Sequence, residues 1–199
     1  MQPLGAAAAV VQVTDINDGR YSHIYQSAMS LLVIDFTYLE GQDNELVVKE
    51  VAAVDSNCNR VSSYVFNRPC GWEEVPMFNA RMNQAIDHGC KWNVSDIPYS
   101  ELETLLHRQA SSAVAIYCFV PQKTEFIGSF IDRTVIDITQ LGCPQLADIS
   151  LLTIICIFAR HNKSKHVCAL RSAYSLAQWL NIYTLSMQHA KCPPQPAYH

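Results

Sequence analysis

The order of the apolar runs constrains the fold of this chain more than any other feature. Three short runs come first, at residues 31–36, 46–54 and 60–67, and each has the length and composition of a strand. The turn at residues 55–59 joins the last two as a hairpin. Three strands in succession predict a sheet that begins with antiparallel pairs.

The later part of the chain alternates between helical and strand patterns. Apolar strand runs occupy residues 113–118 and 134–138. Helices are predicted at residues 78–86, 100–109, 123–131 and 168–186. Ser100 is the expected N-cap of the second helix, with Glu103 as the matching carboxylate. Strands followed by alternating helices and strands predict an α/β domain, with a mixed sheet and helices on both faces.

The length of 199 residues fits one domain with a substantial core. Residues 1–29 start with an Ala-rich stretch and contain a turn signal, so they are predicted to be a poorly ordered extension. Residues 30–189 then form the domain. Residues 190–199 include Cys-Pro-Pro-Gln-Pro and are predicted to be a tail.

Charge is scarce in this chain. Charged residues make up 16% of it, against about 25% in an average globular protein, which predicts an apolar surface or a protein partner. The net charge of -4 excludes a strong, purely electrostatic nucleic-acid binder. Local cations occur at Arg160, Lys163 and Lys165. They are candidate phosphate contacts, with an ordinary solvated loop as the equal alternative.

The eight cysteines are spread along the chain, and no signal peptide is visible. The longest apolar runs have only the length of a strand. These features predict an intracellular protein with free or metal-bound thiols and no membrane span.

Four segments, in this order, resemble the DEDDh 3′–5′ exonucleases, which have the RNase H-like fold. Asp35 ends the first strand run, where that family places the first aspartate of its Asp-x-Glu motif, and Glu50 lies in a similar second strand, Lys-Glu-Val-Ala-Ala-Val. Asp87-His-Gly resembles the family's Thr-His-Gly-Ile stretch. His166-Val-Cys-Ala-Leu-Arg-Ser-Ala resembles its closing His-x-Ala-Leu-x-Asp-Ala helix. The resemblance covers residues 30–186 and implies a site built from Asp35, Glu50 and His166.

Most of the carboxylates of that family are missing here. Thr37 stands at the glutamate of the first motif, and Lys123 or Thr124 stands where a third acid is required. Arg171 or Ser172 replaces the last aspartate. Two magnesium ions need several carboxylates to hold them on either side of a phosphate. The sequence therefore predicts that two-metal hydrolysis, with magnesium as its cofactor, has been lost.

A degenerate branch of the same fold, the Maelstrom domain, is similar in lacking these acids and carries a Glu-Cys-His-Cys set. The resemblance implies Glu50, Cys156, His161 and Cys168 as zinc ligands, although the spacing Cys156-x4-His161-x6-Cys168 is looser than in that family. Zinc takes thiolate and imidazole ligands in tetrahedral geometry, and a carboxylate can complete the set. His166 is a nearer fourth ligand than Glu50. The alternative is that both cysteines pack as small hydrophobic residues.

Glu50 lies in an otherwise apolar strand, and burying a carboxylate is costly unless it is paired or coordinated. A functional Glu50 is one interpretation. The other is simple strand alternation, with Val48, Glu50 and Ala52 on one face.

Three functions fit these observations. The first is a degenerate exonuclease-like module with a structural zinc site that binds single-stranded RNA or DNA, or a protein partner. The second is a ribonuclease that does not use two metals. The third is a structural subunit of a viral or transposon-derived assembly, which only the scarcity of charge motivates.

Overall fold

A computed structural model describes residues 30–40, 46–67, 97–149 and 168–190. The predicted extension at residues 1–29, the predicted helix at 78–86 and the cations Arg160, Lys163 and Lys165 lie outside these ranges. In chain order the elements are β1 (Ser30–Glu40), β2 (Leu46–Asp55), β3 (Val61–Val65), η3 (Tyr99–Glu101), α2 (Leu102–Ala110), β4 (Ala113–Cys118), α3 (Pro121–Phe130), β5 (Val135–Asp137), η4 (Ile138–Leu141) and α4 (Ala169–Ala190).

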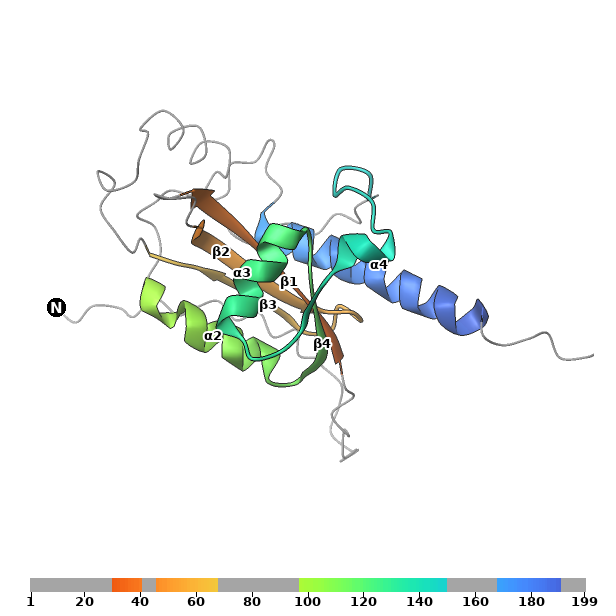
Figure 1. Cartoon of the computed structure of the whole chain (residues 1–199), viewed down its shortest axis with the longest axis horizontal. Helices are drawn as coiled ribbons and strands as arrows, with labels where there is room; N and C mark the ends of the chain where they lie inside the picture. Colours follow the sequence, from red (N-terminus) through yellow and green to blue (C-terminus); the bar gives the residue numbers. More distant parts are fainter. Residues whose placement is uncertain (1–29, 41–45, 68–96, 150–167, 191–199) are drawn as a thin grey trace, which may run out of the picture.

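The five strands form one mixed sheet in the order β3-β2-β1-β4-β5 (Figure 1). β1 pairs with β2, and β2 with β3, in antiparallel register. β4 runs parallel to β1, and β5 runs parallel to β4. The predicted antiparallel start is confirmed. The parallel strands follow because helix α3 returns the chain from β4 to β5 in the same direction.

Helices cover both faces of the sheet, as the α/β pattern predicts. α2 and α3 lie on one face, where their apolar residues pack against Leu32, Ile34 and Phe36 of β1 (Figure 1). α4 lies on the opposite face and packs against β1 and β2. Val33 of β1 belongs to this second core. Successive strand side chains point to opposite faces, so a single strand, β1, supplies both cores.

A β-bulge in β2 decides which way Glu50 points. Thr37 of β1 pairs with Glu50, but the next residue, Tyr38, pairs with Val48, so Lys49 is the extra residue of the bulge. Val48 packs in the core under α2 and α3, whereas Glu50 faces α4. The alternation that places Val48 and Glu50 on one face is therefore wrong, because the bulge shifts the pleat by one residue.

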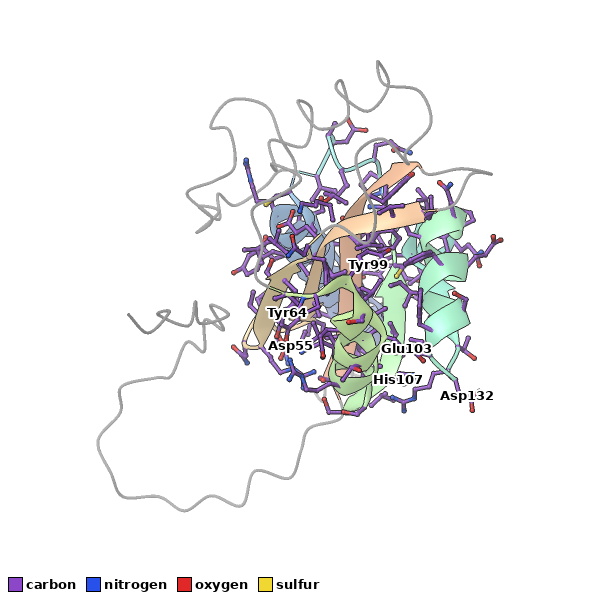
Figure 2. The ribbon with its side chains drawn as sticks, turned by 90° about the vertical axis from the view of Figure 1, so that its left-hand side faces the viewer. Asp55, Tyr64, Tyr99, Glu103, His107 and Asp132 are labelled. Atoms are coloured by element: carbon purple, nitrogen blue, oxygen red, sulfur yellow. The ribbon has the colours of Figure 1, made fainter. Side chains whose placement is uncertain are left out.

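Tyrosine hydroxyls tie the antiparallel ribbon to α2 and η3. Figure 2 shows Tyr64 of β3 beside α2, whose Glu103 and His107 are labelled. The Tyr64 hydroxyl accepts a hydrogen bond from Gln109 Nε2 at 2.7 Å, and Tyr99 Oη accepts one from the Val48 backbone N–H at 3.1 Å. In both contacts a polar group at a buried or half-buried position has a hydrogen-bond partner. Such contacts favour a single arrangement of the helix on the sheet.

Most predicted boundaries agree with the structure to within a few residues, but the start of α2 differs. A 3-10 turn, Tyr99–Glu101, precedes the helix, and its N-cap residue is Glu101, with no side-chain capping bond. The prediction of Ser100 as the cap is wrong. Ser100 lies inside the 3-10 turn, so it cannot take the extended backbone that a capping side chain needs.

Candidate functional site

Two buried carboxylates lie on the α4 side of the sheet, on neighbouring strands. Asp35 of β1 pairs in register with Ala52, and Glu50 of β2 pairs with Thr37, so the two acids are diagonal neighbours. Each residue is 1% exposed. The negative charge of Asp35 reaches Glu50 and contributes to raising the pKa of that carboxyl. The structure therefore brings together two of the three residues that the resemblance implied.

Lys123 supplies the counter-charge for Asp35. Its ammonium Nζ lies 2.6 Å from Asp35 Oδ1 and donates a second hydrogen bond to the Phe36 carbonyl at 2.7 Å. The same ammonium lies 5.2 Å from the centre of the Phe36 ring. The side chain of Asp35 is only 2% exposed, so water contributes little to its charge balance. Lys123 is thus the cation that allows this aspartate to stay buried as a carboxylate.

An unfavourable backbone conformation directly precedes the helix that carries Lys123. Val120 has φ 68° and ψ 149°, a region that a β-branched residue very rarely adopts. The Val120 carbonyl accepts bonds from the backbone N–H of Thr124 at 3.1 Å and from its hydroxyl at 2.9 Å. Pro121 then opens α3. Strain of this kind costs of order 1–3 kcal/mol and persists where surrounding contacts hold it, often beside functional groups.

Glu50 joins the sheet to the start of α4. Its Oε2 accepts a hydrogen bond from the Ala169 backbone N–H at 3.1 Å. Burial raises the pKa of Glu50 from its ordinary 4.5 to about 7, and the charge of Asp35 acts in the same direction. The backbone N–H groups of Ala169 and Leu170 and the side chain of Ser63 oppose this rise. Burial outweighs them, so Glu50 exchanges its proton near neutral pH.

The other polar groups near Asp35 and Glu50 are an aspartate that caps a helix, a protonated thiol and a threonine hydroxyl. Asp137 Oδ1 caps η4, where it accepts bonds from the Thr139 backbone N–H at 2.9 Å and from its hydroxyl at 2.7 Å. Burial raises the pKa of the Cys118 thiol, and the charge of Asp35 adds to the effect, so Cys118 stays protonated. Thr37 Oγ1 is buried and has no hydrogen-bond partner among the residues that the structure describes.

The predicted zinc set is only partly within the described ranges. Cys168 is buried and directly precedes Ala169, whose backbone N–H donates a hydrogen bond to Glu50 Oε2. Cys156 and His161 lie outside the described residues, as do His166 and the candidate phosphate contacts Arg160, Lys163 and Lys165. Within the described ranges, no three His, Cys, Asp or Glu side chains are grouped to hold a metal ion.

The sequence marks Lys123 only as a position where an acid is absent. In the structure its side chain makes the central contact of the site, with Asp35. The signal was its place in the first turn after β4, because that turn and the end of β1 share one edge of the sheet.

No family model matches this chain, and no curated protein matches it. The role of the site therefore rests on its own geometry.

Proposed function

We propose that this chain is a degenerate exonuclease-like domain of the RNase H-like type. In this proposal it binds single-stranded nucleic acid, RNA before DNA, and does not hydrolyse it by two-metal chemistry. One observation carries the loss of two-metal chemistry: the Lys123 ammonium lies 2.6 Å from a carboxylate oxygen of Asp35. The binding of nucleic acid rests on the family resemblance of the sequence. Asp35 is the only acid of the expected metal-binding set that this sequence retains.

The chemistry of two-metal hydrolysis explains why this contact matters. Two divalent ions stabilise the attacking and leaving oxygens, and several carboxylates must offset their charge. At Asp35 a fixed single positive charge already offsets the one carboxylate. A divalent ion placed there would meet the ammonium as a like charge at short range. Thr37, which stands at the next acid position of the motif, offers only a hydroxyl.

The architecture supports the same proposal. An antiparallel ribbon of three strands comes first, two parallel strands follow, and helices cover both faces. This is the arrangement that the exonuclease resemblance implies. Asp35 lies in the middle of the central strand β1, two residues after Val33, the last β1 residue that pairs with β4, and not at the end of the strand as the sequence predicts.

A structural zinc ion held by Glu50, Cys156, His161 and Cys168 belongs to this proposal. The contact between Glu50 and Ala169, the first residue of α4, supports it, because Cys168 directly precedes Ala169 in the chain. Zinc would fix the start of α4 to β2 and would hold Glu50 as a carboxylate. Metal analysis of the wild type and of Cys168→Ser tests this part: one equivalent of zinc, lost in the variant, is expected.

The test of the main proposal measures binding and cleavage separately. Fluorescence anisotropy with labelled single-stranded RNA and with DNA of the same sequence measures affinity, in EDTA and in magnesium. We expect equal RNA affinity in both buffers, weaker DNA binding and intact RNA on a denaturing gel. Cleavage that requires magnesium and disappears in Asp35→Asn would overturn the proposal. Absence of binding to either strand would also overturn it.

A ribonuclease that works without two metals is the second candidate, and the raised pKa of Glu50 favours it. A group with a pKa near 7 suits general acid–base catalysis. Its 1% exposure and its bond to the Ala169 N–H make it remote from any substrate, so the binding module is the better interpretation. Cleavage in EDTA that is lost in Glu50→Gln, but kept in Glu125→Gln on the exposed side of α3, would reverse this ranking.

A further inference from the structure

All exposed lysine and arginine side chains of the described residues gather at the C-terminal end of helix α2. The described ranges contain six such residues, and three of these are buried or partly buried: Lys49, Lys123 and Arg171. The other three are exposed: Arg60, Arg108 and Arg133. We call these three residues the arginine corner. Figure 2 shows this end of α2, where His107 of its last turn is labelled.

Hydrogen bonds to backbone carbonyls fix two of these arginines at the helix end. Arg60, directly before β3, donates from Nη2 to the Gln109 carbonyl at 3.0 Å. Arg133, in the loop before β5, donates from Nη1 to the carbonyls of Ala110 and Ala113, at 2.7 and 2.6 Å. Gln109 and Ala110 are adjacent at the end of α2, so the two guanidinium groups flank it and offset the negative end of the helix dipole.

No carboxylate of the described residues neutralises these charges. Arg108 donates to the Tyr64 hydroxyl at 3.2 Å and lies over that ring, 5.9 Å from its centre. Figure 2 labels three acids in this part of the fold, Asp55, Glu103 and Asp132. None of them, and no other described carboxylate, has an oxygen within 4.0 Å of the three guanidinium groups. The arginine corner therefore contacts only neutral groups of the described chain, and its positive charge is left for an anion.

Arg133 keeps part of its guanidinium group free beside a cavity. Both of its hydrogen bonds use Nη1, so Nε and Nη2 have no acceptor among the described residues. These two atoms form the fork that can bind two oxygens of one phosphate. Arg133 and Thr134 line a cavity of about 330 Å³. Its other lining residues are apolar: Val114, Ala115, Ile116 and Ile136. Apolar walls with a few polar groups are typical of ligand sites.

We propose that the arginine corner binds neighbouring phosphates of single-stranded RNA, an inference that rests on the proposed function and adds the place where the strand lies. A planar guanidinium group matches the oxygens of a phosphate, and one already held by the backbone loses less freedom on binding. A phosphate on Arg133 leaves its sugar or base beside the apolar wall of the cavity. β4 begins at this corner and ends before Lys123, so the strand lies away from the contact between Lys123 and Asp35.

Lipid headgroups and acidic proteins also offer negative groups to arginine. Helices that bind membrane surfaces carry Lys and Arg along one polar face, opposite an apolar face. The three arginines here come instead from three separate segments around the end of a helix. Within the described residues, no helix is long and apolar enough to cross a membrane. RNA is therefore favoured, and the other two partners are outcomes of the test.

The salt dependence of RNA binding by the full chain tests this proposal. Each phosphate contact on a single strand contributes about −0.7 to the slope of log K against log salt. Fluorescence anisotropy with labelled oligouridine measures K from about 50 to about 200 mM NaCl. Arg60→Gln, Arg108→Gln and Arg133→Gln are each expected to make the slope shallower by about 0.7, and the triple variant by about 2. Over this range the loss of affinity should be roughly twenty times larger for the wild type than for the triple variant.

Two further variants separate phosphate contact from other effects. Arg171→Gln removes the same charge from a partly buried residue of α4, and it should keep the wild-type slope. Val114→Glu places a carboxylate in the cavity at a residue that is 50% exposed, and it leaves the bonds of Arg133 to the end of α2 intact. It should make the slope shallower as Arg133→Gln does, with an unchanged free energy of unfolding in urea.

Wild-type affinity and slope in the triple variant would overturn this inference and leave the proposed function standing, whereas a wild type that binds no RNA would end both. The inference also fails if Arg171→Gln changes the slope as much as Arg133→Gln does, or if Val114→Glu has no effect. Labelled polyglutamate and phosphatidylserine vesicles are the remaining probes. Binding of either one that depends on the arginine corner, without binding of RNA, would assign this surface to a protein or a membrane instead.

Discussion

Neutralising Glu50 is expected to stabilise the protein at neutral and alkaline pH. Burial raises the pKa of Glu50 from 4.5 in its ordinary state to about 7 in the folded chain. The folded state therefore binds the proton more tightly than the unfolded state, and stability falls as pH rises from about 4.5 to about 7. At roughly 1.4 kcal/mol for each pH unit, the loss amounts to about 3 kcal/mol.

Glu50→Gln removes this titration and keeps an oxygen that can accept the Ala169 N–H. In EDTA, which removes any zinc bound at Glu50, we expect the free energy of unfolding of the variant to exceed that of the wild type by up to about 3 kcal/mol at pH 8. The difference should shrink through pH 6 and vanish near pH 4.5. Urea unfolding followed by circular dichroism at four pH values measures it. Glu125→Gln, an exposed acid on α3, is the control and should show no such trend.

Two results would refute this reasoning. One is a difference between Glu50→Gln and the wild type that does not depend on pH. The other is a wild type that gains stability, relative to the variant, as pH rises from 5 to 8. Either result would mean that the hydrogen bonds from the start of α4 outweigh burial and hold Glu50 as a carboxylate.

Three further changes test the contacts around the site. Lys123→Met leaves Asp35 buried without its cation and should cost about 3–5 kcal/mol, most of which Asp35→Asn in the same chain should restore; chemical unfolding of both variants measures this. Glycine usually stabilises a fold less than alanine, but at Val120 the reverse is expected, because only glycine adopts these backbone angles without strain. The unfolding free energy of Val120→Gly should exceed that of Val120→Ala by about 1 kcal/mol or more. Tyr64→Phe removes the acceptor of buried Gln109 and should lower the melting temperature, at a cost of about 1–3 kcal/mol.

The sheet could be predicted from the sequence because most of its strands coincide with apolar runs. The run at residues 113–118 coincides with β4, and the hairpin of β2 and β3 follows from two runs joined by a short turn. Apolar periodicity depends only on which face is buried, and a single chain carries that information. The same holds for α4, whose buried residues Ala173, Leu176 and Leu180 have helical spacing.

The site could be predicted only in part, because its geometry depends on local irregularities. The bulge at Lys49, which turns Glu50 toward α4, leaves no mark in the pattern of apolar residues. The backbone of Val120 is equally hidden, since a valine there gives no signal of a positive φ. The contact between Lys123 and Asp35 joins residues far apart in the chain, so it depends on the sheet order that sets them side by side.

Manganese binding, followed by electron paramagnetic resonance on the full chain, tests the central claim most directly. If the Lys123 ammonium takes the place of metal at Asp35, the wild type and Asp35→Asn should bind manganese identically, with no site that depends on this aspartate. A stoichiometric manganese site in the wild type that disappears in Asp35→Asn would contradict the account.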